Sequence, residues 1–366
     1  MVRKVYFFCS FLYFENDVTG GHGTLIRQMA NYLLKEGYEV EVVALYGLSD
    51  PDAPYQTHVL HRWRHSPEWG PVLKMLFWMV AISRLAHFIL FKIKDSKTSK
   101  FISLTAGASL VLPLFFPHTI IWENVAYIEK RPLIDRFRLS IIRLFKGVVV
   151  VPTHAEKCTL DNILFSPDVR YIKNWFSPNT FESELRKDQY SLKFMLAGML
   201  QKRKGFDLFI EAMRLIKDKV PKRSSFHIYG NGSERETLLK LIQKYGLDDM
   251  VQLKGFANNL DALYKDYDIF ILPSRLEGFP LVMLNALSSG LPVIAFDCPT
   301  GPGSIIKSDQ NGMLVPNGDI NALSEAIEHF IVMGGSVREY SPKCVESAKP
   351  YQIDVVMKDW LKLLET

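Results

Sequence analysis

The sequence predicts an α/β protein with two doubly wound domains, and three observations support this fold class. The chain has 366 residues, more than a single hydrophobic core usually supports. Short β-branched or aromatic runs alternate with amphipathic segments of helical length almost throughout. One polar segment, residues 174–189, lacks clear periodicity and is typical of a linker. Strands that alternate with helices form parallel sheets through right-handed crossovers.

The first series of elements defines an N-terminal domain over residues 1–175. It begins with a buried strand over 5–8 and a glycine-rich turn at 20–23, which precedes a helix over 24–35. The later strands and helices are expected at 39–45, 72–93, 101–104, 119–122, 133–145, 148–151 and 153–163.

The second series defines a C-terminal domain over residues 190–345. Its strands are expected at 192–196, 226–229, 251–253, 269–272 and 292–295, and its clearest helices at 206–217 and 234–245. The remaining segment, 346–366, contains a short amphipathic helix that we expect to pack back on the first domain. Doubly wound sheets bind ligands beyond the carboxyl ends of their strands, so we expect the site in the cleft between the domains.

The composition is that of a soluble globular protein, with 23% charged and 48% apolar residues. The first eight residues lack the long apolar core and the cleavage site of a signal peptide. Four cysteines are scattered without paired spacing, which favours a reducing cytoplasm over zinc or a disulfide framework: Cys9, Cys158, Cys298 and Cys344.

Positive charge is concentrated in the first domain, where residues 60–146 carry 14 Lys and Arg against 5 Asp and Glu. This asymmetry indicates either an anionic partner or a solvated basic surface. The apolar run 72–94 lies within it, but Arg84 and His87 interrupt it, so a bilayer span is rejected. Two interpretations stay open: a helix packed on the N-terminal sheet, or a helix in a membrane interface edged by Lys74, Arg84, Lys92 and Lys94. The stretch has no nucleic-acid recognition motif.

The segment 275–295 is the most informative part of the chain. It follows the hydrophobic strand 269–272 and predicts a turn containing Gly278 and Pro280 and then a helix. A helix N-terminus offers unpaired N–H groups and partial positive charge, which suits a diphosphate. Glu277 lies at the rim of this anion site, where a bound sugar would lie. The pattern therefore indicates group transfer from a phosphorylated donor.

The loop 197–205 follows the first strand of the second domain and contains three successive cations, Lys202, Arg203 and Lys204. Adjacent cations repel one another unless they are solvated or face an anion. At the carboxyl end of a strand, Arg203 can bind a phosphate with two hydrogen bonds, and Lys204 can add a point charge.

The glycine-rich loop in the first domain, with Gly20, Gly21 and His22, allows a backbone to approach a phosphate or sugar closely. It has no G-x-G-x-x-G pattern, so a nicotinamide cofactor is not expected. Two D-x-D pairs imitate the metal-binding pair of other sugar transferases, but both occupy boundary or turn positions and are interpreted as structural: Asp50 with Asp52, and Asp266 with Asp268.

Together these features resemble the retaining, group 1 (family four) nucleotide-sugar glycosyltransferases, whose GT-B fold has two Rossmann-like domains facing each other across a cleft. The motifs that carry the resemblance lie at 277–281, 298–302, 311–312 and 315–316. Bacterial enzymes that build lipopolysaccharide, capsule or other surface glycans are similar in this region. The resemblance implies transfer with retained anomeric configuration, with neither a cofactor nor a required metal.

The resemblance also assigns roles to particular residues. It implies Lys204 at the donor diphosphate and Glu277 beside the transferred sugar, both counted as catalytic. The expected substrate-binding residues are Gly20, Gly21, His22, Asn124, Arg203, Gly278, Phe279, Leu281, Val282 and Asn285.

Four positions depart from the family pattern. Asn285 stands where a second glutamate usually holds the ribose hydroxyls, and its uncharged amide predicts weaker nucleotide binding. Met199 replaces a common arginine, for which Arg203 could substitute from the same loop. Asn124 occupies the place of a frequent histidine, and Ser304 that of a frequent acidic residue.

We therefore expect a cytoplasmic hexosyltransferase, and a peripheral position on the inner face of the plasma membrane stays open. Its donor would be a nucleoside-diphosphate sugar, expected to be UDP-linked, and its acceptor a lipid-linked or surface glycan that enters over the first domain. Two alternatives stay open: a non-catalytic glycan-assembly partner with the same fold, or a sugar-nucleotide epimerase.

Overall fold

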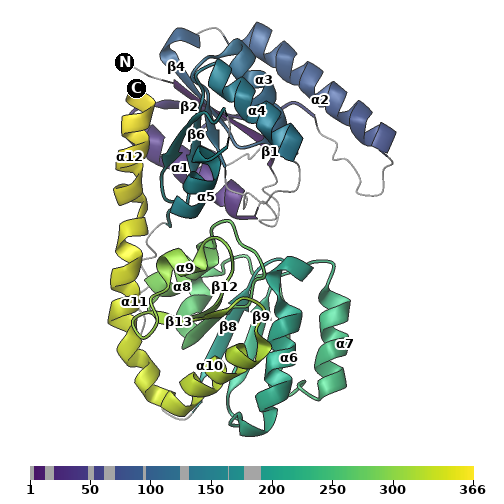
Figure 1. The fold of residues 1–366 in the computed structure, drawn as a ribbon, viewed down its shortest axis with the longest axis vertical. Helices are drawn as coiled ribbons and strands as arrows, with labels where there is room; N and C mark the ends of the chain where they lie inside the picture. Colours follow the sequence, from purple (N-terminus) through teal and green to yellow (C-terminus); the bar gives the residue numbers. More distant parts are fainter. Residues whose placement is uncertain are drawn as a thin grey trace. The chain divides into compact units, whose positions relative to one another are not determined.

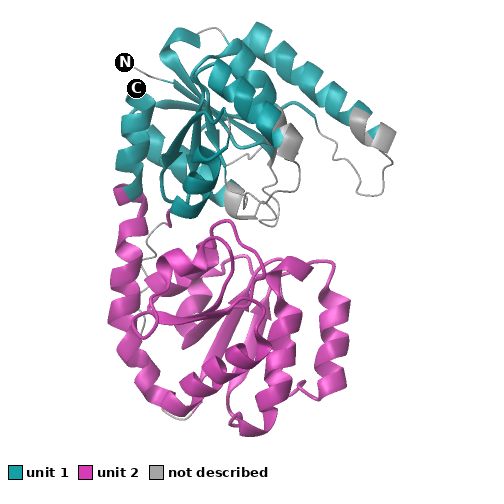
Figure 2. Cartoon of the chain, viewed as in Figure 1, with its two compact units in different colours: residues 1–173, 356–366 teal, residues 174–355 magenta. Residues whose placement is uncertain are grey.

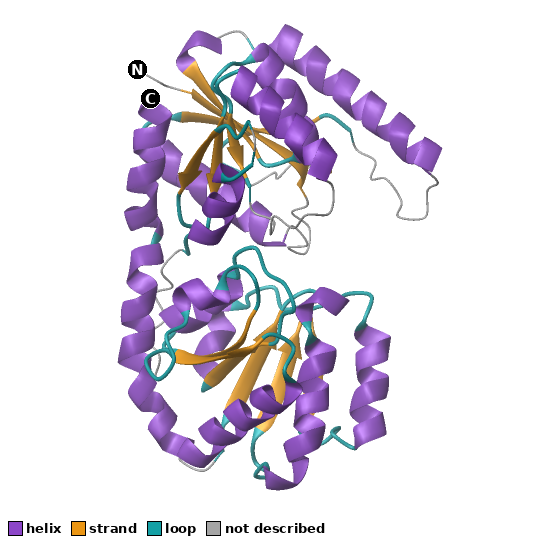
Figure 3. Cartoon of the chain, viewed as in Figure 1, coloured by secondary structure: helices purple, strands orange, loops and turns teal. Residues whose placement is uncertain are grey.

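The chain folds into two compact units, each an α/β structure. A computed structural model describes residues 4–12, 20–47, 53–61, 71–93, 96–123, 132–163, 165–176 and 191–366. Unit 1 comprises residues 1–173 together with 356–366, and unit 2 comprises residues 174–355 (Figure 2). Strands and helices alternate along the described parts of both units (Figures 1 and 3). The predicted α/β class is confirmed.

Unit 1 is built on a seven-stranded parallel sheet with the order β3-β2-β1-β4-β5-β6-β7. Its central strands are apolar on both faces, because helices cover both faces of a doubly wound sheet. Residues 5–9 of β1 are accordingly all buried. The strands are β1 (Lys4–Leu12), β2 (Glu39–Gly47), β3 (Gln56–Val59), β4 (Ser99–Ser103), β5 (Ile120–Trp122), β6 (Val148–Val151) and β7 (Asp168–Tyr171).

The helices of unit 1 follow its strands in the chain. They are α1 (Gly20–Lys35), α2 (Pro71–Lys92), the 3₁₀ turn η2 (Ser96–Thr98), α3 (Ala106–Phe115), α4 (Pro132–Leu144) and α5 (His154–Asp161). The last helix, α12 (Ile353–Glu365), belongs to unit 1 from Val356 onward. Trp360 is fully buried in it, and its ring meets that of Trp122 edge-on at a centroid distance of 5.0 Å.

Unit 2 has a six-stranded parallel sheet with the order β10-β9-β8-β11-β12-β13. Its strands are β8 (Lys193–Ala197), β9 (Ser225–Tyr229), β10 (Val251–Gly255), β11 (Ile269–Leu272), β12 (Val293–Asp297) and β13 (Gly312–Pro316). Its helices are α6 (Phe206–Ile216), α7 (Arg235–Tyr245), α8 (Leu281–Ser288), α9 (Pro302–Ile305), α10 (Ile320–Met333) and α11 (Ser341–Ala348). The 3₁₀ turns are η3 (Lys202–Lys204), η4 (Lys217–Lys219), η5 (Asp261–Asp266), η6 (Gly334–Tyr340) and η7 (Lys349–Tyr351).

Two apolar layers enclose the sheet of unit 2. One contains side chains of α6, α7 and α10, including Phe209 and Phe330. The other contains side chains of α8 and α11, including Met283 and Cys344. Because both faces are covered, central strands such as β11 consist entirely of buried apolar residues.

The two sheets share one connection pattern. In each, the first strand lies inside the sheet, the next two strands extend to one side, and the fourth strand pairs on the other side. All strands stay parallel, but the side on which successive strands are added changes. This switch point lies between β1 and β4 in unit 1, and between β8 and β11 in unit 2. Loops that leave such a switch point diverge and open a crevice at the carboxyl ends of the strands.

Several element boundaries differ from the sequence-based expectation. The segment 20–23, expected as a turn, is the first turn of α1, which begins at Gly20. The strands β3, β7 and β13 were not expected, because each lies at a sheet edge and lacks a continuous buried apolar run. Unit 2 continues to residue 355 and includes α11, whereas residues 356–366 belong to unit 1.

Candidate functional site

The candidate site lies at the switch point of unit 2. The loop after β8 carries Lys204, and the loop after β11 carries Glu277. These strands are neighbours in the sheet, although 73 residues separate the two side chains in sequence. The Nζ atom of Lys204 lies 2.5 Å from Oε1 of Glu277. The topology thus brings together the two residues that the sequence assigned to catalysis.

Glu277 is a buried carboxylate with three polar neighbours. It is 4% exposed, and Oγ of Ser274 donates a hydrogen bond to its Oε1 at 2.6 Å. Nη1 of Arg203 lies 3.8 Å from Oε2, and the Thr300 hydroxyl donates to the Glu277 backbone carbonyl. A buried carboxylate is stable only when paired and hydrogen-bonded. Lys204 and Ser274 meet this requirement and fix the orientation of the carboxylate.

The loop after β8 touches the loop after β11 at Gly205. Its φ of +67° lies in the left-handed region, and a Cβ placed there would lie 1.7 Å from the carbonyl oxygen of Pro273. Glycine is required on both counts. The backbone N–H of Arg275 also donates to the Arg203 carbonyl at 2.9 Å. The two loops therefore form one backbone-linked unit that carries both Lys204 and Glu277.

The start of α8 supplies backbone N–H groups to the same crevice. Pro280 is the N-cap residue, and no side chain caps the helix. The N–H groups of Leu281 and Val282 belong to the first turn, where a helix provides no backbone acceptor. Gly301 lies close by, since a Cβ on it would come within 2.7 Å of Pro280 Cδ. An anion at this helix start would meet amide donors and the positive end of the helix dipole.

Two predicted substrate-binding residues on this segment have defined partners. The ring of Phe279 packs in the core of unit 2 against Tyr351 at a centroid distance of 5.9 Å. Asn285 is half-buried on α8, and its Nδ2 donates to Oδ1 of Asp261 at 2.8 Å. Sequence reasoning missed Asp261, because nothing in the local pattern of η5 marks it.

Two further residues that the sequence did not single out are Asp207 and Arg275. The guanidinium of Arg275 donates to both carboxylate oxygens of Asp207, at 2.6 and 2.8 Å. Burial alone would raise the pKa of the Asp207 carboxyl, but the hydrogen bonds and charges of Arg275 and Lys202 lower it to about 2. The carboxyl is thus ionised at every physiological pH.

The predicted residues of the first domain lie in unit 1. Gly20, Gly21 and His22 form the first turn of α1, after β1 at the switch point of that sheet. Asn124 lies outside the described residues. Its neighbour Glu123 forms an ion pair with the buried Arg138.

Of the two D-x-D pairs, only Asp266 and Asp268 lie within the described residues. Asp50 and Asp52 lie outside the described residues. Asp268 accepts a hydrogen bond from the Lys193 backbone N–H at 2.9 Å, which ties β8 to the start of β11. Within the described ranges, no three His, Cys, Asp or Glu side chains cluster as metal ligands would.

Helix α2 has an apolar outer face. Phe77, Ala81, Leu85, Phe88 and Ile89 point into the core of unit 1. The opposite face exposes Leu73, Leu76, Met79, Val80, Leu90 and Phe91. None of the helices in the described parts of the chain has the length and hydropathy of a bilayer span.

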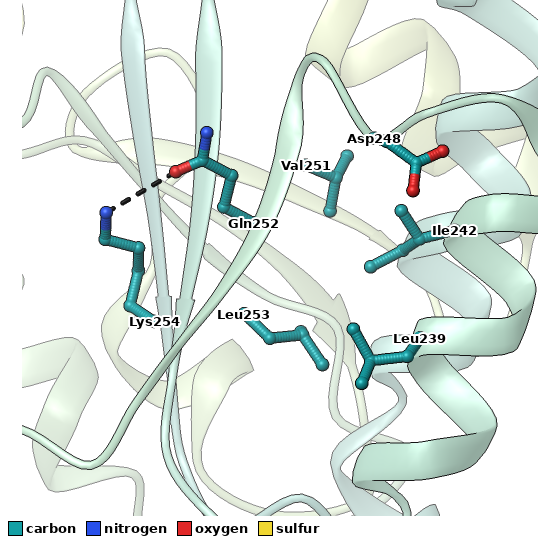
Figure 4. Close-up of a pocket in the computed structure, with 7 residues that line it drawn as sticks. All are labelled: Leu239, Ile242, Asp248, Val251, Gln252, Leu253 and Lys254. Atoms are coloured by element: carbon teal, nitrogen blue, oxygen red, sulfur yellow. Dashed lines mark hydrogen bonds between the residues drawn. The ribbon is translucent and has the colours of Figure 1, made fainter.

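A shallow depression of about 450 Å³ lies at the other side of the unit 2 sheet, between α7 and the edge strand β10 (Figure 4). Leu239, Ile242 and Leu253 form its apolar wall, and Asp248 lies at one end. Lys254 donates to Gln252 at 3.4 Å. This depression is separated from β8 and β11 by β9 and does not include the Lys204–Glu277 pair.

The architecture is that of the GT-B glycosyltransferases. S. aureus TarM, in a crystal complex with Fondaparinux, alpha-GlcNAc-glycerol and UDP, superposes with a TM-score of 0.81 at 16% identity, covering 100% of both chains. Residues 179–349, nearly all of unit 2, match the family described as Glycosyl transferases group 1. The match covers just under half of the chain, and the candidate site lies inside the matched region.

Two curated relatives extend the comparison. An uncharacterized glycosyltransferase of Haemophilus influenzae is 24% identical over 94% of this chain and 96% of its own length. A poly(ribitol-phosphate) alpha-N-acetylglucosaminyltransferase of Staphylococcus aureus is 28% identical over 63% of this chain. The chain spans only 46% of that second relative, and 14% of a Streptomyces coelicolor exopolysaccharide phosphotransferase.

Proposed function

We propose that the protein transfers a hexose from a nucleoside-diphosphate sugar to a lipid-linked or surface glycan, with retention of anomeric configuration. The proposed donor is a UDP sugar. The observation that carries the proposal is the Lys204–Glu277 pair beside the uncapped start of α8. A cation, amide donors and an oriented carboxylate are the groups that a departing diphosphate and a reacting sugar require. UDP in the TarM complex and the names of the surface-glycan relatives support the donor and acceptor classes.

Each group has a place in the reaction. Lys204, Arg203 and the N–H groups of Leu281 and Val282 would neutralise the diphosphate as its bond to the anomeric carbon breaks. Glu277 would accept hydrogen bonds from the sugar hydroxyls. The acceptor hydroxyl would then form the new bond to the anomeric carbon on the same face from which the diphosphate departs, and its proton would pass to an oxygen of the departing diphosphate. These cations and amide donors would balance the diphosphate charge without a metal ion.

The test is turnover with labelled UDP-glucose, UDP-galactose, UDP-N-acetylglucosamine and the corresponding GDP sugars. We expect Lys204→Ala and Glu277→Ala each to lower turnover by orders of magnitude, roughly the 100- to 1,000-fold that loss of one preorganised donor costs. Lys219→Ala and Glu328→Ala are matched controls, because these residues form an exposed 2.8 Å ion pair on other helices. Near wild-type rates for both site variants would rule out the site.

The same incubation separates the other two classes of function. An isomerised donor would indicate an epimerase, and a wild-type protein that binds but never converts a donor would indicate a non-catalytic assembly partner. The anomeric coupling constants of the product sugar report retention directly. Activity that survives extensive chelation supports metal independence, and activity lost on chelation and restored by a divalent ion refutes it.

We also propose that the outer face of α2 contacts the inner surface of the plasma membrane, where a lipid-linked acceptor would be found. Its exposed leucines and Phe91 lie on one side of a 22-residue helix that also carries Arg84 and Lys92. Exposed apolar residues edged by cations suit an interface with anionic lipids.

Vesicle sedimentation tests this second proposal. Vesicles that contain anionic phospholipid should retain the wild-type protein, and Leu76→Glu with Met79→Glu should reduce retention. Val332→Glu is the matched control, because Val332 is 80% exposed on α10 in unit 2. Equal retention of all variants would refute a role for this face.

A further inference from the structure

The Asp207–Arg275 pair joins the two loops that carry the reacting groups. Asp207 lies in the first turn of α6, two residues after Gly205, and Arg275 lies two residues before Glu277. The two terminal nitrogens of the Arg275 guanidinium, which form a planar fork, donate one hydrogen bond to each carboxylate oxygen of Asp207. Such two-bond geometry fixes direction as well as distance, and lysine cannot reproduce it.

Arg275 contacts the loop after β8 at two further points. Its Nη1 donates to the Lys202 carbonyl at 2.6 Å, and its backbone N–H donates to the Arg203 carbonyl. Lys202 Nζ lies 2.5 Å from Oδ2 of Asp207, which closes a ring of contacts around the η3 turn. The contacted residues on this side, Lys202, Arg203 and Asp207, all lie within three positions of Lys204 in the sequence.

Arg275 is also attached to a third segment. The side-chain amide of Asn317 donates to the Arg275 carbonyl at 3.2 Å, just after β13. The side chains of Asp207 and Arg275 are 13% and 30% exposed, so solvent weakens the pair less than it weakens a surface ion pair. The hydrogen bonds and ion pairs given above for these two side chains do not involve Glu277 or Lys204.

We propose that Asp207 and Arg275 are positioning residues that set the placement of Lys204 and Arg203 relative to Glu277 and the start of α8. This inference rests on the proposed function for its catalytic consequence, but its structural content stands on the contacts alone. If the pair breaks, η3 loses the side-chain brace that does not involve Glu277. It then stays attached to the loop after β11 through the contacts of Lys204 and Arg203 with Glu277 and through the backbone contacts at Gly205 and Arg203.

The catalytic test compares ligands that do and do not carry phosphate. Arg275→Lys keeps the charge but loses the fork, and Asp207→Asn keeps the shape but loses the charge. We expect each to weaken UDP binding and to lower kcat/KM by about 10- to 100-fold, as small displacements of a positioned group do. Uridine binding should be unchanged, because uridine carries no phosphate for the displaced cations.

The double variant and a matched control sharpen the outcome. Because the two residues share one set of contacts around η3, Asp207→Asn with Arg275→Lys should cost less than the sum of the two single losses. Arg214→Lys is the control, since Arg214 pairs with Glu211 at 3.2 Å on the same helix α6. Additive losses, or equal losses for UDP and uridine, would overturn the positioning role.

A second measurement keeps the inference independent of the proposed function. Amide hydrogen exchange in the unliganded protein should accelerate at both 200–206 and 273–278 in Arg275→Lys, but not in Arg214→Lys. Unchanged exchange in both loops would overturn the inference even if the protein is a transferase. Accelerated exchange in a protein that binds no nucleotide would support the positioning pair and refute only the proposed function.

Discussion

The contact between the two site loops at Gly205 yields a sharp prediction. In Gly205→Ala the new methyl group would lie 1.7 Å from the Pro273 carbonyl oxygen, so that oxygen must retreat by about 1.3 Å to reach 3.0 Å, the shortest separation real Cβ atoms tolerate. The left-handed backbone adds about 1–2 kcal/mol for any residue with a Cβ. Forced overpacking typically adds about 1–3 kcal/mol.

Gly246 provides the matched control within the same unit. Its φ of +62° is nearly that of Gly205, but a Cβ there meets nothing within 4 Å. Gly246→Ala should therefore cost only the backbone term, about 1–2 kcal/mol, whereas Gly205→Ala should cost about 2–5 kcal/mol. Urea unfolding followed by far-ultraviolet circular dichroism compares the two free energies of unfolding.

Activity provides a second contrast between the same variants. Displacing the Pro273 carbonyl moves the loop that bears Glu277 away from Lys204, so Gly205→Ala should lower transfer by about 10- to 100-fold. Gly246→Ala, at the end of α7, should leave it unchanged. Equal destabilisation by both substitutions, or full activity in Gly205→Ala, would refute the reasoning from this contact.

Three other predictions concern packing and protonation. Trp360→Ala removes a fully buried indole from unit 1 and should cost about 3–5 kcal/mol in urea unfolding; a loss under 1 kcal/mol would mean that α12 contributes little. Tyr264→Phe removes the hydroxyl that donates to the Val282 carbonyl at 3.0 Å and should cost about 1 kcal/mol, with an unchanged free energy arguing against that bond. Burial, with the charges of Lys254 and Lys193, lowers the pKa of His227 to about 4. The unfolded chain then binds the extra proton first, so stability should fall as pH drops from about 6.5 to about 4, and His227→Gln should show a smaller fall over that window.

Sequence patterns predicted the central elements because burial on both faces leaves a strong signal. The run Ile269–Leu272 is apolar at every position, as a strand covered on both sides must be. The edge strand β7, with Asp168 and Arg170 exposed, has no such signal. Edge strands bury one face at most, so their composition resembles that of a loop.

The candidate site was partly predictable for a similar reason. Lys204 and Glu277 each follow a strand, and parallel topology places the ends of neighbouring strands together. The Asp207–Arg275 pair was not predictable, because its partners are 68 residues apart and each alone resembles an ordinary surface charge. The same holds for Asp261 and Asn285, which are 24 residues apart.

The assignment of residues 356–366 to unit 1 has a consequence for biosynthesis. The first 173 residues are translated long before Trp360, so the nascent N-terminal unit lacks a buried part of its core until residues 356–366 are made. Unit 2, in contrast, is one continuous stretch of the chain, residues 174–355. We therefore expect the removal of residues 356–366 to destabilise the half of the chain that was translated earliest.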